Sequence, residues 1–387
     1  MLPRLLYVGD VPVEASYHGS AFLHRLLSDY PHEKLTIIET ATKSEPGRRL
    51  HEVTYISHPI GRQRWLNTRF HPYVAAWFTQ TGKRHAAGIS QSLNGFDFES
   101  VLTVAHGFGW LAAANIASKR KAPLHLIVND DWPRAALVPS SFRKSLDNRF
   151  ASVYRQAQSR FCVSPAMSRA YNKRYGKPAE VIYASRAPEG PEFDEPPTRL
   201  ASNDKPFTIA FAGTINSNGY IRALLALQDA LKPVGGRLLI FGPLTSDEAK
   251  QVGLDSTTTV CGLLSANDLL VRLRDEADAL FVPMSFDPRD KINMEMAFPS
   301  KLADCTAAGL PLLIYGPSYC SAVTWARENE GIAEVIEAED TLRKAIDRLA
   351  KDPARRVALG KRALDVGRQY FTHQRVQQMF HQALSRG

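Results

Sequence analysis

The residues best suited to chemistry lie in one short segment, Phe298 to Pro311. Ser300 and Lys301 stand where a helix is expected to begin, and free N–H groups with an added cation suit a diphosphate. Asp304 follows one turn later on nearly the same face, where its carboxylate could accept both hydroxyls of a ribose. The segment therefore predicts a nucleoside diphosphate site, although an ordinary capped helix with a surface lysine and aspartate would look the same.

Two strand ends in the N-terminal half carry further candidates. His106 follows one expected strand and could orient a sugar hydroxyl or a phosphate, or be a turn histidine held by backbone groups. Asp130 follows the next and could accept a hydrogen bond from a substrate hydroxyl or, like Asp131, cap a helix. Adjacent aspartates can also ligate a metal, but no supporting ligand pattern surrounds this pair, so no metal site is expected.

Short apolar runs alternate with helix-length segments along the chain, which predicts parallel sheets covered by helices. Strands are expected at 5–8, 35–39, 53–56, 101–104, 124–128, 160–163, 207–212, 238–241, 258–261, 279–283, 312–315 and 333–336. Helices are expected at 20–30, 110–119, 142–157, 165–175, 221–231, 266–276, 300–308, 322–329, 340–349, 353–369 and 372–384. The fold class is therefore α/β, with two Rossmann-like, doubly wound domains facing a central cleft.

A stretch rich in proline and poor in apolar residues interrupts this alternation and is typical of a linker. We expect an N-terminal domain at 1–190, a linker at 191–206 and a C-terminal domain at 207–370. The last segment, 371–387, is expected to form a helix that packs back on the N-terminal domain.

The net charge is unevenly distributed. The 387 residues carry +9, and all of it lies in the first 200, where 26 Lys and Arg face 17 Asp and Glu. This asymmetry favours an anionic partner for the first half, or a basic surface kept for solubility. No nucleic-acid-binding motif is visible, so nucleic acid is not an expected partner. The cysteines lack metal or redox spacing and the N-terminus lacks a signal-peptide pattern, so we expect a cytoplasmic protein, with any membrane contact peripheral.

The segment Phe298–Pro311 resembles the P-S-K-L-x-E-Y-x-A-A-G-x-P block of the group-one, family-four-like retaining glycosyltransferases, which have the GT-B architecture. Three other segments resemble that family in the same order: the start around Gly19, Phe161–Met167 followed by Tyr175-Gly176, and Phe211–Thr214. The resemblance covers nearly the whole chain, and the order of the segments makes it specific.

The resemblance implies that the C-terminal domain binds the donor nucleotide and the N-terminal domain the acceptor. It implies a donor-binding set made of Gly213, Thr214, Pro299, Ser300, Lys301 and Asp304. It implies that Gly19 and Ser20 form an acceptor-side loop in which glycine lets the backbone approach the substrate. The candidate catalytic residues are Lys301, Arg222, His106 and Asp130.

The chain departs from the family pattern at four positions. Asp304 stands where the family usually has Glu, and Met296 stands where it has a second Glu. Asn129 replaces the His of an "H-D" pair, and Arg222 is the candidate for a cation usually found after the first donor-domain loop.

The resemblance implies a glycosyltransferase that moves a sugar from a nucleotide-sugar, UDP- or GDP-linked, to a glycan or lipid-linked acceptor with retention and without a metal or other cofactor. Its expected role is the synthesis of cell-surface polysaccharide or glycoconjugate. Two alternatives stay open: a nucleotide-sugar epimerase of the same fold, and a non-catalytic nucleotide-sugar-binding partner protein.

Residues 60–84 combine arginines, a lysine and five aromatic residues, with no acidic residue. Cations beside exposed aromatics are typical of proteins that contact an anionic membrane surface. The segment therefore indicates a peripheral membrane contact, or a segment whose aromatics pack inward while its arginines are solvated.

Overall fold

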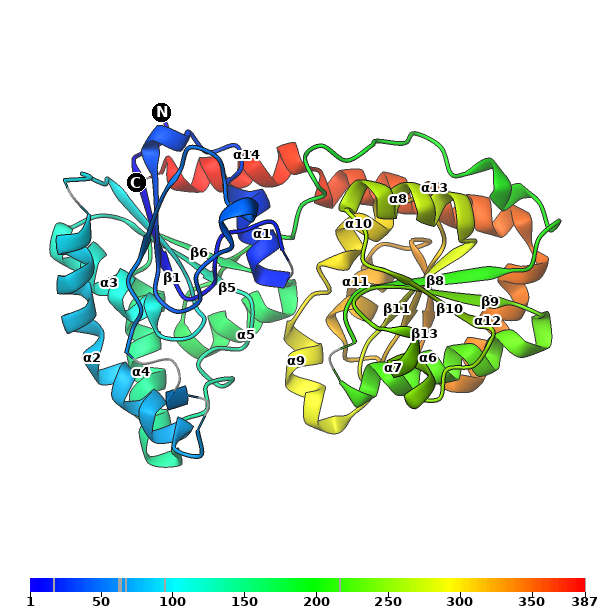
Figure 1. Ribbon diagram of the computed structural model, residues 1–387, viewed down its shortest axis with the longest axis horizontal. Coiled ribbons are helices and arrows are strands. Elements are labelled where there is room, and N and C mark those ends of the chain that lie inside the picture. The colour runs from blue at the N-terminus through cyan, green and yellow to red at the C-terminus, as the bar shows by residue number, and fades with distance from the viewer. Residues whose placement is uncertain (17, 62–64, 67, 94, 216, 387) are drawn as a thin grey trace. The chain divides into compact units, whose positions relative to one another are not determined.

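The computed structural model describes residues 1–16, 18–61, 65–66, 68–93, 95–215 and 217–386. It divides the chain into two compact units (Figure 1). The first comprises Met1–Ala184 with Gln374–Gly387, and the second comprises Ser185–His373.

The first unit is built on a seven-stranded parallel sheet with the order β3-β2-β1-β4-β5-β6-β7. Its strands are β1 Leu5–Gly9, β2 Leu35–Glu39, β3 Thr54–Ser57, β4 Ser100–Val104, β5 Leu124–Val128, β6 Ser159–Cys162 and β7 Glu180–Val181. Its helices are α1 His18–Leu27, α2 His71–Ser92, α3 Gly109–Arg120, α4 Ser140–Gln156, α5 Pro165–Tyr175 and α14 His373–Leu384. Strands β1, β2, β4 and β5 are buried along their whole length, as expected for a sheet covered on both faces.

The C-terminal helix α14 packs on the first unit. Its Phe380 and Val376 join the hydrophobic core that includes Tyr7 and Phe161 from the sheet. The Gln377 side chain donates hydrogen bonds to two carbonyl oxygens at the end of α1, at 2.8 and 3.0 Å. These bonds satisfy backbone acceptors that a helix C-terminus leaves free.

The second unit is built on a six-stranded parallel sheet with the order β10-β9-β8-β11-β12-β13. Its strands are β8 Thr208–Ala212, β9 Arg237–Phe241, β10 Thr258–Gly262, β11 Ala279–Pro283, β12 Leu312–Tyr315 and β13 Ala333–Ile336. Its helices are α6 Asn218–Leu231, α7 Ser246–Gln251, α8 Ala266–Glu276, α9 Lys291–Met296, α10 Lys301–Ala307, α11 Ser321–Glu328, α12 Glu339–Lys351 and α13 Pro353–Phe371. Apolar residues of β8, β9, β11 and β12 form one core with α6 and α12.

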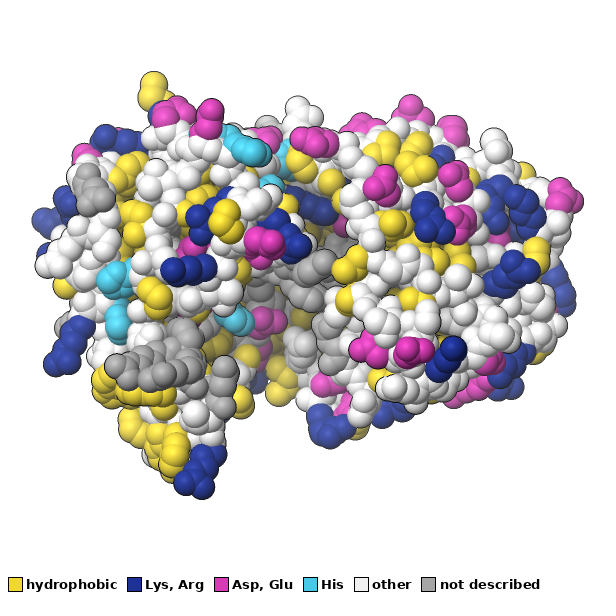
Figure 2. Space-filling model, viewed as in Figure 1, with side chains coloured by type: hydrophobic (Ala, Val, Ile, Leu, Met, Phe, Trp, Pro, Cys, Tyr) yellow, Lys and Arg dark blue, Asp and Glu magenta, His cyan; other side chains and the backbone are white. Residues whose placement is uncertain are grey.

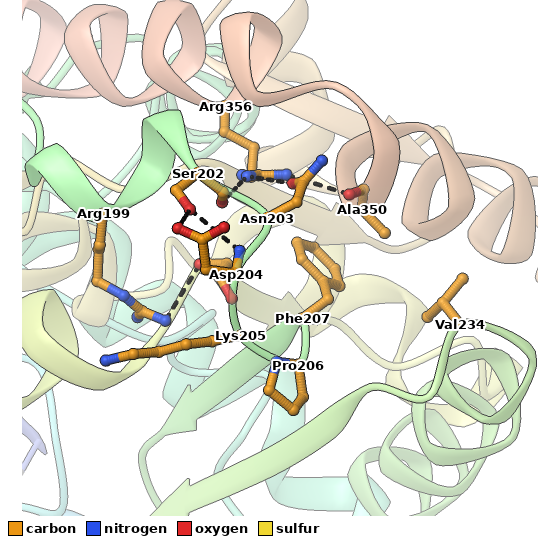
Figure 3. Close-up of a pocket in the computed structure, with 11 residues that line it drawn as sticks. Arg199, Ser202, Asn203, Asp204, Lys205, Pro206, Phe207, Val234, Ala350 and Arg356 are labelled. Atoms are coloured by element: carbon orange, nitrogen blue, oxygen red, sulfur yellow. Dashed lines mark hydrogen bonds and ion pairs between the residues drawn. The ribbon is translucent and has the colours of Figure 1, made fainter.

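The segment 191–206, expected as the linker, runs along the second unit. Arg368 and Lys361 of α13 donate to the carbonyl oxygens of Phe193 and Asp194 at 2.7 and 3.0 Å. Arg356, also on α13, is fully buried although it has no ion-pair partner among the described residues. Its guanidinium instead donates at 2.6–3.3 Å to the carbonyl oxygens of Leu200, Ser202, Leu349 and Ala350 and to the side-chain oxygen of Asn203. Figure 3 shows Arg356 with Ser202, Asn203 and Ala350. Arg356 therefore fastens the end of this segment to α12 and α13 just before β8 begins.

Of the α-helices and strands that the structure describes, four were not expected from the sequence: α2, β7, α7 and α9. Of the helices that the structure describes, none combines the length and the apolarity that crossing a bilayer requires.

Candidate functional site

The site expected to bind the donor begins at the carboxyl end of β8, in the second unit. Gly213 follows the strand with φ +145°, a conformation that favours glycine, and its N–H donates to the Phe241 oxygen at 2.8 Å. Thr214 comes next, half-buried. The carboxyl ends of parallel strands are where ligands bind in such sheets, so this loop is correctly placed to meet one.

Helix α6 starts directly after this loop with its N-terminus open. Ser217 occupies the N-cap position, but its hydroxyl makes no capping hydrogen bond. The Ser217 Oγ is buried and has no hydrogen-bond partner in the described part of the chain. The Ser217 carbonyl oxygen accepts hydrogen bonds from the N–H groups of Tyr220 and Ile221, which lie in the first turn of the helix. The first turn of a 14-residue helix is thus available to an anion.

Lys301 brings a cation to the same loop from α10. Its Nζ lies 4.4 Å from the centre of the Phe211 ring and 5.4 Å from that of Tyr220. It lies 3.7 Å from the place that a Cβ on Gly213 would occupy. Within the described residues Lys301 forms no ion pair, and burial lowers its pKa from 10.5 to about 8. A half-buried cation without an anion, beside an uncapped helix start, is the arrangement that a phosphate group would complete.

The start of α10 itself differs from the expectation. Ser300 was expected to cap this helix, but it has helical dihedral angles, is exposed and makes no side-chain capping bond. The N–H groups of Leu302 and Ala303 already donate to the oxygens of Pro299 and Ser300, and the helix has only seven residues. The anion-binding character therefore belongs to α6, with α10 contributing the Lys301 side chain.

Asp304 is half-buried on α10, one turn after Lys301. Burial lowers the pKa of Arg186, an effect that Glu192 and Asp304 oppose. The Nε and Nη2 of Arg186 are buried without hydrogen-bond partners among the described residues. Asp304 thus lies within electrostatic reach of Arg186.

Arg222, the candidate second cation, contacts Asp287. It is largely exposed on α6, and its Nη2 lies 3.4 Å from Asp287. Arg289 forms the closer pair with Asp287, at 2.7 Å, and together these contacts hold the pKa of Asp287 well below its usual value. Met296 is buried, and the adjacent Glu295 lies 3.9 Å from Lys291.

In the first unit, His106 and Asp130 are both exposed near the carboxyl ends of β4 and β5. The His106 ring lies 6.4 Å from that of Trp132, so the segment after Asp130 packs beside it. Asp131 is different: it is buried and pairs with Arg174 at 2.7 Å, which gives it a structural role. The Asn129 side-chain oxygen is buried and unpaired within the described chain.

Gly19 and Ser20, expected in a loop, lie in the first turn of α1. A Cβ on Gly19 would meet Val11 at 3.4 Å and the Asn129 Nδ2 at 3.7 Å, which are ordinary contacts. Glycine is therefore not required there by the protein itself. Its neighbour Asn129 lies at the end of β5, close to Asp130.

A buried carboxylate that sequence reasoning did not single out holds the His106 loop. Asp10 follows β1 and accepts hydrogen bonds from the Thr40 hydroxyl and from the N–H groups of Phe108 and Gly109. Gly107 has φ +54°, and a Cβ there would overlap the Asp10 carboxylate. Burial raises the Asp10 pKa, while these donors oppose the rise. In the sequence, this role is indicated only by the position of an acidic residue directly after an expected buried strand.

A separate cavity of about 350 Å³ lies before β8 in the second unit (Figure 3). The Arg356 donors there are all used, and the Nη2 of Arg199 pairs with buried Asp278 at 3.2 Å. The Nε and Nη1 of Arg199 are buried without hydrogen-bond partners among the described residues. Among the residues that the structure describes, no group of His, Cys, Asp and Glu is arranged to hold a metal ion.

No protein-family model and no curated protein sequence matches the chain. In structure it is similar to HepE from Anabaena, solved in complex with UDP, with a TM-score of 0.69 and 13% identity over 99% of this chain and 100% of that one. It is similar to sucrose-phosphate synthase from Thermosynechococcus elongatus, with a TM-score of 0.67 and 14% identity over 99% and 100%. It is also similar to WaaG, a glycosyltransferase involved in lipopolysaccharide biosynthesis, with a TM-score of 0.60 and 13% identity over 97% and 99%. The expected α/β class is confirmed, and the chain has the two-domain GT-B fold of these proteins.

Proposed function

We propose that the chain is a nucleotide-sugar-dependent glycosyltransferase. It transfers a sugar from a UDP- or GDP-linked donor to a glycan or lipid-linked acceptor, with retention, in the synthesis of cell-surface polysaccharide or glycoconjugate. The observation that carries this proposal is a Lys301 cation without an ion pair and a Ser217 hydroxyl without a hydrogen-bond partner, both judged among the described residues, beside the open N-terminus of α6. Similar structures solved with UDP and with UDP-glucose support the choice of ligand.

The chemistry follows from the leaving group. When the glycosidic bond to the nucleotide breaks, negative charge grows on the diphosphate, and donors already fixed around it lower the barrier. Lys301 and the first N–H groups of α6 supply those donors, with Gly213, Thr214 and Ser217 around them. In this proposal Asp304 holds the ribose and Pro299 and Ser300 line the same side. No metal or other cofactor is assigned a part.

On the acceptor side, the proposal uses the residues at the carboxyl edge of the first sheet. His106 and Asp130 are exposed there and can hydrogen-bond to an acceptor hydroxyl, with Gly19 and Ser20 on the neighbouring α1. Asp10 is a positioning residue, because it fixes the turn that carries His106. Arg222 has a smaller role in this proposal, because its guanidinium already pairs with Asp287. The enzyme would act in the cytoplasm, at the inner face of the membrane, with residues 60–84 facing an anionic surface.

A thermal-shift screen of UDP, GDP and ADP and their sugars tests the donor assignment, because a ligand that binds the folded state raises the melting temperature. We expect one nucleotide series to raise it in the wild type. We expect the same ligand to act more weakly on Ser217→Ala and on Lys301→Met. Lys250→Met, an exposed substitution on α7, is the matched control and should behave like the wild type. No shift with any nucleotide would refute the assignment.

One alternative rests on specific residues. Asn129 and Met296 stand where the family pattern has His and Glu, which favours a protein that binds a nucleotide-sugar without turning it over. Release of nucleoside diphosphate, measured with and without candidate glycan acceptors, distinguishes a transferase from a non-catalytic binding protein and from an epimerase. Acceptor-dependent release supports the transferase. Binding without release supports the partner protein, and sugar conversion without any acceptor supports an epimerase.

A further inference from the structure

Large apolar side chains gather on the surface of the first unit at the start of α2 and the start of α4. Six of them are between 39% and 67% exposed: Trp65, Phe70, Tyr73, Trp77, Leu137 and Phe142. We call this set the aromatic patch. Hydrophobic side chains are concentrated at the lower end of this unit in Figure 2. Single exposed apolar residues are common, but a group of this size marks a contact surface.

The chain around the aromatic patch is basic and free of acidic residues. Neither 53–96 nor 132–146 contains an Asp or Glu. Arg69, Arg84 and Lys144 are exposed in these two stretches. Arg62 and Arg64, which also belong to the first stretch, lie outside the described residues, and so does the side chain of Lys83. The patch is therefore a group of aromatic and aliphatic side chains with cations around it and no acidic residue within either stretch.

The aromatic patch is held in place by local bonds. The Thr68 hydroxyl donates to the Trp65 oxygen at 2.8 Å and accepts from the Phe70 N–H at 3.3 Å. The Arg69 guanidinium lies 4.9 Å from the centre of the Phe70 ring. Arg149 of α4 donates to the Thr79 oxygen at 2.6 Å, which ties α4 to α2. These contacts connect the turn before α2 and the helices α2 and α4 that carry the exposed side chains.

A row of packed rings leads from the aromatic patch to the acceptor-side histidine. Trp77 packs on Phe78 at 5.7 Å between ring centres, and Phe78 is fully buried. Phe78 packs on Phe108 at 5.6 Å, and Phe108 on Trp132 at 6.3 Å. Trp132 lies 6.4 Å from His106. A surface bound to the patch would therefore lie at the outer end of the same packed layer that carries His106.

We propose that the aromatic patch docks the first unit on an anionic lipid bilayer, and that the acceptor is a lipid-linked molecule presented at that surface. Aromatic rings favour the bilayer interface, and each nearby cation adds attraction to anionic lipid. The sign of the charge selects this partner, because the two stretches that carry the patch contain cations and no carboxylates, which complements lipid phosphates. The choice of acceptor rests on the proposed function, whereas the docking itself does not.

Liposome flotation tests the docking. We expect the wild type to bind vesicles of phosphatidylcholine with phosphatidylglycerol, and to bind at least tenfold less at high salt because screening weakens the attraction. The triple variant Trp65→Ser, Phe70→Ser, Tyr73→Ser and the double variant Arg69→Glu, Arg84→Glu should each lose at least tenfold in binding. The matched control is Leu263→Ser with Val271→Ser, which alters side chains of similar exposure in the second unit and should bind like the wild type.

Nucleotide binding, measured on the same variants, keeps the two proposals separate. All variants should retain the wild-type melting temperature, because the altered side chains are exposed. The patch variants should also retain the donor affinity, because they lie in the first unit and the proposed donor site lies in the second. Equal binding to neutral and anionic vesicles, or binding to neither, would overturn the docking. So would a dimer, seen by light scattering, that the triple variant abolishes without any lipid binding. Failure of nucleotide binding alone would leave the docking in place.

Discussion

Replacing Lys301 by Met should stabilise the ligand-free protein. Burial lowers the pKa of Lys301 from 10.5 to about 8, which means that the folded state disfavours its charge. Among the described residues no anion offsets the cost of burying this charge. A neutral side chain of similar shape should therefore raise the free energy of unfolding. If Lys301 stabilised the fold, its replacement by Met would instead lower the free energy of unfolding.

The magnitude follows from two opposing effects. The lowering of the Lys301 pKa from 10.5 to about 8 corresponds to about 3 kcal/mol. The variant also loses the contacts of Nζ with the Phe211 and Tyr220 rings, which are worth about 0.5–1 kcal/mol each. Lys301 is only half-buried, so water recovers part of the first amount. We expect a net gain of about 1–2 kcal/mol in the free energy of unfolding at pH 7.

The pH dependence has a definite sign. Between pH 8 and pH 10.5 the unfolded chain binds more protons at this lysine than the folded one, so the wild type gains stability there as pH rises. The advantage of Lys301→Met should therefore be largest below pH 8 and shrink toward pH 10. Urea unfolding at pH 7 and pH 9.5, without nucleotide, measures both values. Lys250→Met should change neither by more than about 0.5 kcal/mol. A variant that is less stable than the wild type by 1 kcal/mol or more at pH 7 would refute the reasoning.

Three further predictions follow from the site and the fold. Asp304→Asn should weaken binding of the nucleotide-sugar about tenfold or more in calorimetric titration, because a charged hydrogen bond contributes about 1.5–3 kcal/mol; an unchanged dissociation constant would remove Asp304 from the site. Arg356→Met should lower the free energy of unfolding by about 2–4 kcal/mol, since it leaves buried carbonyl oxygens without donors; a change below about 0.5 kcal/mol would show that Arg356 does not fasten the 191–206 segment. Transfer activity should persist in excess EDTA, because Lys301 and α6 are assigned the charge of the leaving group; loss that magnesium or manganese restores would contradict this.

Most of the sheet could be predicted because its strands are short, apolar and separated by amphipathic helices. The expected strands 35–39, 124–128, 279–283, 312–315 and 333–336 coincide with those of the structure. Helix α2 was missed because its exposed aromatics blur the amphipathic pattern on which such predictions depend. The short α7 and α9, of six residues each, offer too few turns for a period to show.

The site was predictable where a motif carries it and not where tertiary contacts do. Lys301 stands out in the sequence, but its neighbours Ser217 and Phe211 are brought to it only by the fold. The capping role expected of Ser300 was wrong, because the backbone there is already helical. Asp10 could not be singled out, since its importance comes from donors about 30 and 100 residues away along the chain.

Calorimetric titration of the wild type and of Lys301→Met with UDP and GDP tests the central claim most directly. We expect one of the two nucleotides to bind the wild type with 1:1 stoichiometry, and Lys301→Met to weaken that affinity at least tenfold while its fold remains intact. Binding should also weaken above pH 8, as the Lys301 ammonium loses its proton. Equal affinity for the wild type and the variant, or no binding of either nucleotide, would contradict a donor site at Gly213, Ser217 and Lys301.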